Sequence, residues 1–206
     1  MTSSWAKFSL CLLGVADWEV HMPIPSELFL LPTWFPMHPG RMWCHSRMVY
    51  LPMGYLYGAR FVYAAAASDP LIAALKHELY LERRWASIDW ASARESVAPT
   101  DNYSPIHPLM KVAQRALLFW EERGGALKRS LRRRGLAYSL DYMRAEDLQT
   151  NFIDIGPVNK VFNMLSCFHA AGGDVNAENF QRHVLRVPDY LWVAEDGLSA
   201  RAVSSS

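Results

Sequence analysis

Several features that would assign a chemistry at once are missing from this chain of 206 residues. It has three cysteines, Cys11, Cys44 and Cys167. Their odd number argues against a disulfide-rich secreted module, and no spacing of His, Cys, Asp or Glu is typical of a metal site. No P-loop, Gly-x-Gly-x-x-Gly or Gly-x-Ser-x-Gly element occurs. The sequence therefore predicts no bound metal and favours a reducing compartment.

An excess of charge of one sign is also missing. Lys and Arg number 21 against 20 for Asp and Glu, a net charge of +1. This balance gives no electrostatic case for a nucleic-acid partner. One basic run, Lys128–Arg134, stands out. It is either a solvated helix face, which the neutral chain favours, or a patch for anionic lipid or nucleic acid.

Long apolar runs are absent, since none reaches the roughly 18 to 20 residues of a membrane-spanning helix. Phe8–Val15 resembles the core of a signal peptide, but Trp18 and Glu19 stand where small cleavage-site residues are needed. Leu28–Met37 has two interpretations. It is a proline-bent core segment, or an interfacial membrane segment with Trp34 at the level of the lipid headgroups.

Helical patterns dominate what is present. Hydrophobic residues make up 51% of the chain, enough for a sizeable core. Proline and glycine punctuation predicts helices at 71–81, from 105 or 108 to 123, at 126–144 with an interruption at Gly135, at 158–171, at 176–186, and one more from 188. No convincing strand pattern appears. We expect an all-α fold of antiparallel helices in a bundle, a solenoid or an α/α barrel.

The helix at 158–171 has an apolar stripe that we expect to be its buried face. Its members recur at helical spacing and are Val158, Val161, Phe162, Leu165 and Phe168.

The segment Pro36–Tyr57 is unusually rich in aromatic residues. If 41–51 is helical, one face carries Trp43, Ser46, Arg47 and Tyr50, and His45 lies about 100° further around. Aromatic faces and an imidazole on a cavity wall could hold a cation or accept a proton. The alternative, which composition alone favours, is an ordinary aromatic core. Cys44 and His45 are adjacent, so we do not expect them to pair as nucleophile and base.

Several stretches, in order and spacing, resemble the oxidosqualene cyclases, which make lanosterol, cycloartenol and related triterpenes. They are Trp18–Glu19, Pro23–Glu27, His38–His45, Arg47–Met53, Lys76–Tyr80, Ile88–Trp90, Ile155–Lys160, Asn163–Leu165 and Arg186–Gly197. The resemblance covers residues 5–197. The string at 193–197 is nearer to cycloartenol synthases than to animal lanosterol synthases.

The resemblance implies a fold of two α/α barrels around an apolar cavity, of which this chain holds an incomplete part. It implies a monotopic enzyme on the endoplasmic reticulum membrane or lipid droplets. The implied reaction needs no cofactor. An acid protonates the epoxide of (3S)-2,3-oxidosqualene, the chain cyclises through carbocations held by aromatic faces, and a base removes the last proton.

The family's site residues carry over by position. Trp43 is expected to stabilise a cation through its ring, and His45 to stabilise the late cation and take part in final deprotonation. Ser46 and Tyr50 resemble a constriction between the entry channel and the cavity. Ser46 stands where the family usually has cysteine, which puts gating and substrate fit in question.

Other family motifs do not occur here. The general-acid Asp-Cys-Thr-Ala-Glu string and the Gln-Trp repeats are absent from the chain. We therefore expect a fragment of a cyclase, inactive alone, with a partial barrel domain at 1–197 and a non-matching, disordered tail at 198–206. The alternative is a non-catalytic helical protein that binds a lipid or pairs with a cyclase.

Overall fold

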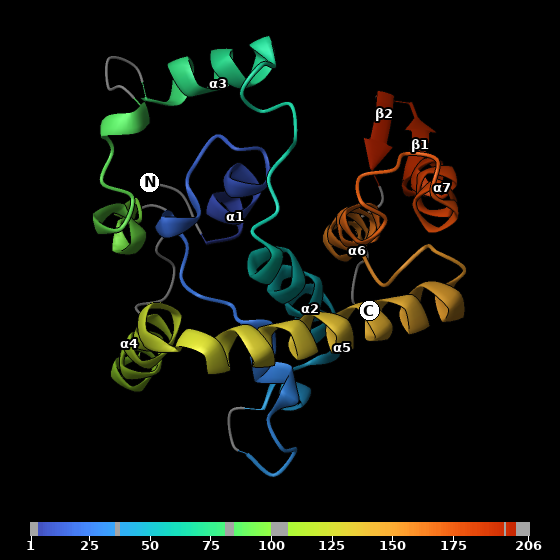
Figure 1. Ribbon diagram of the computed structural model, residues 1–206. Coiled ribbons are helices and arrows are strands. Elements are labelled where there is room, and N and C mark those ends of the chain that lie inside the picture. Colours follow the sequence, from blue (N-terminus) through green and yellow to red (C-terminus); the bar gives the residue numbers. More distant parts are fainter. Residues whose placement is uncertain (1–3, 36–37, 81–84, 100–106, 196, 201–206) are drawn as a thin grey trace. The chain divides into compact units, whose positions relative to one another are not determined.

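The computed structural model describes residues 4–35, 38–80, 85–99, 107–195 and 197–200 (Figure 1). The chain divides into two compact parts. The first part comprises Met1–Pro23 and Arg60–Gly125, and the second comprises Ile24–Ala59 and Ala126–Ser206. Each part is described by itself.

The first part begins with helix α1 (Ser4–Leu12) and the short helix η1 (Trp18–Val20). Phe8, Cys11 and Val15 are completely buried, and the Phe8 ring meets the Trp18 ring edge-on at 5.2 Å. Most of the apolar run at 8–15 is therefore core, although Leu13 is 41% exposed.

Lys7 ties α1 to a distant segment of the first part. Its side chain is only 3% exposed, and its Nζ donates to the carbonyls of Ala93, Arg94 and Ser96 at 2.8–3.1 Å. These three acceptors lie in and just after the short helix η5 (Ser92–Glu95). A buried ammonium needs such partners, because it has lost its water.

The remaining helices of the first part follow the punctuation of the sequence. They are α3 (Pro70–Tyr80), η4 (Trp85–Ser87) and α4 (Pro108–Arg123). Proline opens both α3 and α4, as predicted, since it lacks only an N–H that the first turn cannot use. Pro105 and Leu81, the other boundaries considered, lie outside the described residues. After α4 the backbone turns left-handed at Gly125, with φ +53°.

The second part contains η2 (Ser26–Leu30), η3 (Pro39–Arg41) and α2 (Cys44–Ala59). It continues with α5 (Gly125–Thr150), α6 (Pro157–Ala170), α7 (Glu178–Leu185) and η7 (Val187–Tyr190). α2 and α7 both pack against α6. The predicted helices at 126–144, 158–171 and 176–186 are confirmed, although α5 runs six residues further than expected.

A proline inside α2 makes it depend on α6. Pro52 has no N–H, so the Met48 carbonyl four residues earlier lacks its helical donor. Asn159 of α6 fills that role, since its Nδ2 donates to the Met48 carbonyl at 2.9 Å. The buried carbonyl is thereby satisfied by a side chain 111 positions away in the sequence.

Gly135 does not interrupt α5, which corrects the sequence prediction. The helix is continuous across it. A Cβ at Gly135 would lie 2.7 Å from the backbone carbon of Ser26. The glycine therefore permits a close approach between α5 and η2. Beside it, Arg132 pairs with Glu27 at 2.9 Å, whereas Arg129, Arg133 and Arg134 are exposed, as expected of a solvated face.

The buried face of α6 was predicted wrongly. Val158 and Val161 are exposed, and of the predicted apolar stripe only Phe162 is fully buried. The buried face instead carries mostly polar side chains: Asn159, Lys160, Asn163, Ser166 and Cys167. The apolar pattern fails because polar groups from neighbouring elements compensate these side chains.

The end of the chain also differs from the prediction. Pro188 opens only the short helix η7, and the antiparallel strands β1 (Leu191–Ala194) and β2 (Gly197–Ala200) follow. Residues 198–200 of the proposed tail belong to β2. Residues 201–206, and Asp196 within the string that resembles cycloartenol synthases, lie outside the described residues. The domain boundary at 197 stays a prediction.

Apart from this hairpin, the secondary-structure elements of the described residues are all helices, which agrees with an all-α fold. Among them, no helix is both long enough and apolar enough to cross a membrane.

Candidate functional site

The aromatic site lies where α2 begins. Trp43 is the residue just before the helix, and its ring centroid is 4.6 Å from that of His45, at an interplanar angle of 38°. The Trp43 side chain is 62% exposed, and His45, Ser46 and Tyr50 are half-buried. The ring contact brings the two residues expected to be catalytic side by side.

The rest of α2 is buried. From Met48 to Tyr57, every residue except the half-buried Tyr50 is buried. The two interpretations of the aromatic segment thus apply to different halves of it. The second half is core, and the first turn is exposed at Cys44 and half-buried from His45 to Arg47. The assignments of Trp43, His45, Ser46 and Tyr50 remain predictions.

Two arginines hold the loop that precedes the site. Arg47 Nη1 donates to the Gly40 carbonyl at 3.1 Å, and Arg41 Nη2 reaches the Trp34 carbonyl at 3.5 Å. His38 Nδ1 accepts from the Gly40 N–H at 2.9 Å. These contacts fix the direction in which the chain enters α2.

Cys44 and His45 approach each other, contrary to expectation. Cys44 Sγ lies 3.5 Å from His45 Nδ1. The two Cα–Cβ bonds diverge, but rotation of both side chains in the uncrowded first turn closes the gap. Cys44 is exposed.

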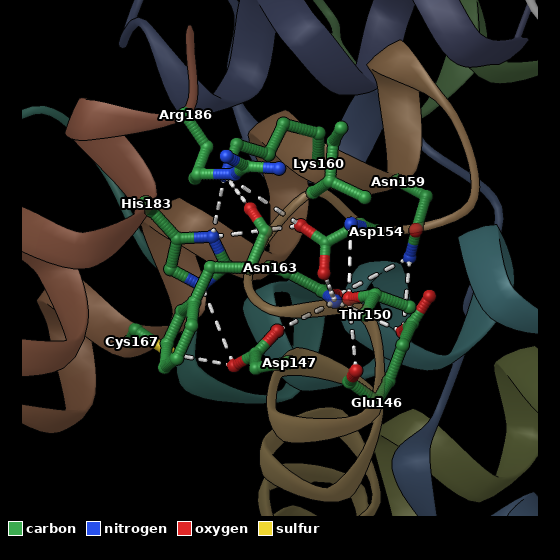
Figure 2. Close-up of polar contacts among 12 residues, drawn as sticks. Glu146, Asp147, Thr150, Asp154, Asn159, Lys160, Asn163, Cys167, His183 and Arg186 are labelled. Carbon is green, nitrogen blue, oxygen red and sulfur yellow. Dashed lines mark hydrogen bonds and ion pairs between the residues drawn. The ribbon is translucent and has the colours of Figure 1, made fainter. Parts of the chain in front are cut away.

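A second, buried site lies between α5, the turn that follows it, α6 and α7 (Figure 2). Asn163 of α6 is at its centre. Its Nδ2 lies 3.0 Å from Glu146 Oε2, 3.3 Å from Asp147 Oδ1 and 3.4 Å from Asp154 Oδ1. One amide thus faces three carboxyl groups, and we call the whole set of polar side chains around it the polar cluster.

Lys160 and His183 complete the polar cluster. Lys160 Nζ donates to the Phe152 carbonyl and lies 2.9 Å from His183 Nδ1 and 3.9 Å from Asp154 Oδ2. On the other side of the imidazole ring, His183 Nε2 lies 3.3 Å from Asp147 Oδ2. Cys167 Sγ is 3.5 Å from the same carboxyl oxygen. All these side chains are buried.

Burial shifts the pKa values of several groups in the polar cluster. Burial, followed by the neighbouring carboxyl groups of Asp147 and Glu146, raises the pKa of Asp154 to about 8. Burial also raises the pKa of Glu146 and raises that of the Cys167 thiol to about 12. It lowers the pKa of Lys160, against the pull of Asp154.

Strained backbone brings these groups together. Asn151, Phe152 and Asp154, in the turn between α5 and α6, all have φ between +52° and +63°. Residues other than glycine adopt this conformation at a cost that the surrounding contacts must offset. Thr150 Oγ1, which accepts from the Asp154 N–H at 3.1 Å, helps to hold the turn.

The sequence prediction missed the polar cluster entirely. One signal was present, because Asn159, Asn163 and Cys167 recur every four residues and so share a helix face. Such a stripe normally faces solvent, and only the arrival of Asp147 and His183 from other helices makes it a buried site.

Comparisons with known proteins identify the class to which this fold belongs. Residues 1–196 match the model of the squalene-hopene cyclase N-terminal domain. The chain belongs to this cyclase family, and its helices represent an incomplete all-α cyclase toroid.

The curated relatives are whole enzymes of sterol and triterpene synthesis. Over 203 residues, 98% of this chain, it is 41% identical to lanosterol synthase of Homo sapiens and 37% identical to cycloartenol synthase of Dictyostelium discoideum. It is 34% identical over 205 residues to protostadienol synthase A of Aspergillus fumigatus, covering 27% of that protein. The chain spans about a quarter of the length of these relatives.

Proposed function

We propose that this chain supplies one wall of the active-site cavity of an oxidosqualene cyclase. The observation that carries the proposal is the contact between the Trp43 and His45 rings at the exposed start of α2, in a chain of the cyclase family. An indole face stabilises a nearby cation through its quadrupole, and an imidazole beside it can accept a proton. The substrate is (3S)-2,3-oxidosqualene and the product is a sterol precursor.

In the proposed reaction, an acid protonates the epoxide and the polyene cyclises through successive carbocations. Trp43 stabilises positive charge as it develops, and His45 stabilises the last cation and takes part in removing its proton. Ser46 and Tyr50, one turn apart, border the path by which substrate enters. Cycloartenol is the proposed product over lanosterol, on the residues at 193–197 alone.

Because the family's acid motif does not occur in these 206 residues, the proposal includes inactivity of the chain on its own. The experiment has two arms. Purified chain is incubated with 2,3-oxidosqualene, and a chimera is made by exchanging this chain for the matching quarter of the human lanosterol synthase. We expect no cyclic product from the chain and cyclisation by the chimera.

The chimera then tests the two residues. His45→Ala and Trp43→Ala should lower kcat by at least about 100-fold, while His77→Ala, an exposed histidine of α3, leaves it unchanged. A folded chimera that tolerates His45→Ala would overturn the site. Cyclisation by the chain alone would overturn its inactivity. Saturable binding of an oxidosqualene analogue without any activity in the chimera would favour a non-catalytic lipid-binding protein.

We also propose that the parent enzyme lies on the surface of the endoplasmic reticulum membrane or of lipid droplets. Trp34, 72% exposed next to Phe35, supports an interfacial segment at 28–35. Co-sedimentation with neutral phospholipid vesicles should weaken in Trp34→Ala. Equal vesicle binding by the unmodified chain and by Trp34→Ala would contradict the interfacial segment.

A further inference from the structure

The polar cluster contains a donor set that the cyclisation reaction does not use. Asp147 on α5, Cys167 on α6 and His183 on α7 each offer one ligand atom, and these atoms lie within 4.8 Å of one another. Carboxylate oxygen, thiolate sulfur and imidazole nitrogen are the three ligand types of zinc sites. Three separate helices therefore converge on one point with compatible chemistry (Figure 2).

The distances fit a tetrahedral ion. Ligand atoms that sit 2.0–2.3 Å from a zinc ion are separated from each other by about 3.3 to 3.6 Å. Asp147 Oδ2 lies 3.3 Å from His183 Nε2 and 3.5 Å from Cys167 Sγ. Two edges of the tetrahedron are thus already formed around the Asp147 oxygen.

A second observation also points to a ligand. His183 has no exposed surface, and its Nε2, directed at Asp147, makes no hydrogen bond with any described residue. Buried nitrogen atoms are rarely left in this state. A metal ion bound through Nε2 would satisfy it.

The electrostatics favour a cation. Three buried carboxyl groups, those of Glu146, Asp147 and Asp154, surround the Asn163 amide at 3.0–3.4 Å. A divalent ion would compensate their charge more completely than the one ammonium of Lys160 does. The ion also has an entry path, because Cys167 lines a surface pocket of about 190 Å³ together with Arg144 and Glu178.

We propose that Asp147, Cys167 and His183 bind a zinc ion that joins α5, α6 and α7. Three protein ligands leave a fourth position for water. Asp154 supports the site from behind, because its Oδ2 lies 3.5 Å from His183 Nδ1. A carboxylate placed there fixes which imidazole nitrogen binds the metal.

Binding rearranges protons without a further reactant. The ion replaces the proton of the Cys167 thiol, which is released to solvent. The His183 proton moves from Nε2 to Nδ1, and the Nδ1–H group then donates to Asp154. Lys160 turns from Nδ1 to the Phe152 carbonyl and Asp154, both of which it already contacts. At least the Cys167 thiol proton leaves for each ion bound.

The test titrates the full chain with Co²⁺, which replaces zinc and gives a thiolate charge-transfer band when a cysteine binds it. The three cysteines allow a matched design. Cys11 is buried, with its thiol pKa raised to about 12 like that of Cys167. Cys44 is exposed beside His45. We expect the double variant Cys11→Ser/Cys44→Ser to bind one Co²⁺ with the band intact, and Zn²⁺ to displace it.

Further variants decide the remaining outcomes. Cys167→Ser should abolish the band, and Asp154→Asn should weaken Co²⁺ binding about 10- to 100-fold. Absence of the band in a folded double variant would overturn the proposal, whether or not Cys167→Ser folds. Loss of the band in Cys44→Ser alone would also overturn it, because the ion would then lie at the exposed Cys44–His45 pair.

Discussion

Two lysines are buried, one in each part of the chain, and they are stabilised in different ways. Lys7, 3% exposed, is surrounded by three backbone carbonyls. Lys160, 2% exposed, lies among ionisable side chains and has one carbonyl partner. Carbonyl dipoles solvate the Lys7 cation without carrying charge of their own, whereas Lys160 is stabilised by charged and titratable groups.

The pKa values of neighbouring groups move in opposite directions in the two parts. Burial lowers the pKa of His21 to about 4, and the positive charges of Lys7 and Arg60 act in the same direction. In the polar cluster, the pKa of Asp154 moves up instead. In both places burial is the largest cause, and it disfavours the charged form, which lowers the pKa of a base such as His21 and raises that of an acid such as Asp154.

The largest effect is expected from Lys160→Met. It leaves buried carboxyl groups without their cation and should lower the free energy of unfolding by about 3–5 kcal/mol. Urea unfolding of the full chain, followed by tryptophan fluorescence, measures it. Lys111→Met, at an exposed position of α4, serves as control and should change stability by less than about 0.5 kcal/mol. Equal midpoints for the two variants would contradict the role of Lys160.

Next is the pH dependence set by His21. Its folded-state pKa lies below its unfolded value, so the unfolded chain takes up a proton first as the pH falls. The contribution of neutral His21 to the free energy of unfolding is fully present above about pH 6.5 and is lost towards pH 4. It amounts to about 3 kcal/mol. Urea midpoints at pH 7 and pH 4 measure it. His21→Gln should flatten this slope and His77→Gln should not. An unchanged slope in His21→Gln would refute the assignment.

Lys7→Met should cost less than Lys160→Met. It removes the ammonium donor from three carbonyls, of which that of Ala93 still accepts from the Ser96 N–H at 3.2 Å, and it leaves no unpaired buried charge, which corresponds to about 1–3 kcal/mol. The same urea experiment ranks the two variants. A larger loss for Lys7→Met would reverse the comparison between the two lysines.

The link between Pro52 and Asn159 is smaller and calls for a double-mutant cycle. Asn159→Ala leaves the Met48 carbonyl unpaired. In a Pro52→Ala background the restored N–H at position 52 can satisfy that carbonyl, so the same change should cost about 1 kcal/mol less. Additive changes in the free energy of unfolding would show that the two positions are independent.

The smallest effect is expected from Trp43→Ala. With 62% of its side chain exposed, its removal should change stability by less than about 0.5 kcal/mol. Phe152→Ala, at a side chain only 2% exposed, is the matched aromatic control and should cost about 3–5 kcal/mol. A large loss in Trp43→Ala would show that the residue serves the fold of this chain.

Much of the fold could be predicted because the residues that start a helix lie at its boundary in the sequence. Pro70, Pro108 and Pro157 each open a helix, since a proline in the first turn gives up only an N–H without an intrahelical acceptor. The family was identified from ordered motifs, which need no tertiary information. The aromatic site was predicted from the same motifs, and its two rings prove to be in contact.

The tertiary structure alone decided which face of α6 is buried. Local periodicity predicted that Val158 and Val161 are buried, because a helix in a globular protein usually turns its apolar side towards the core. The fold instead brings Asp147, Asp154 and His183 against the polar side, and buried polar groups are stable only when such partners are present. Those partners come from the turn after α5 and from other helices. The sequence by itself determined where the helices begin and to which family the chain belongs. The packing between distant segments determined the polar cluster.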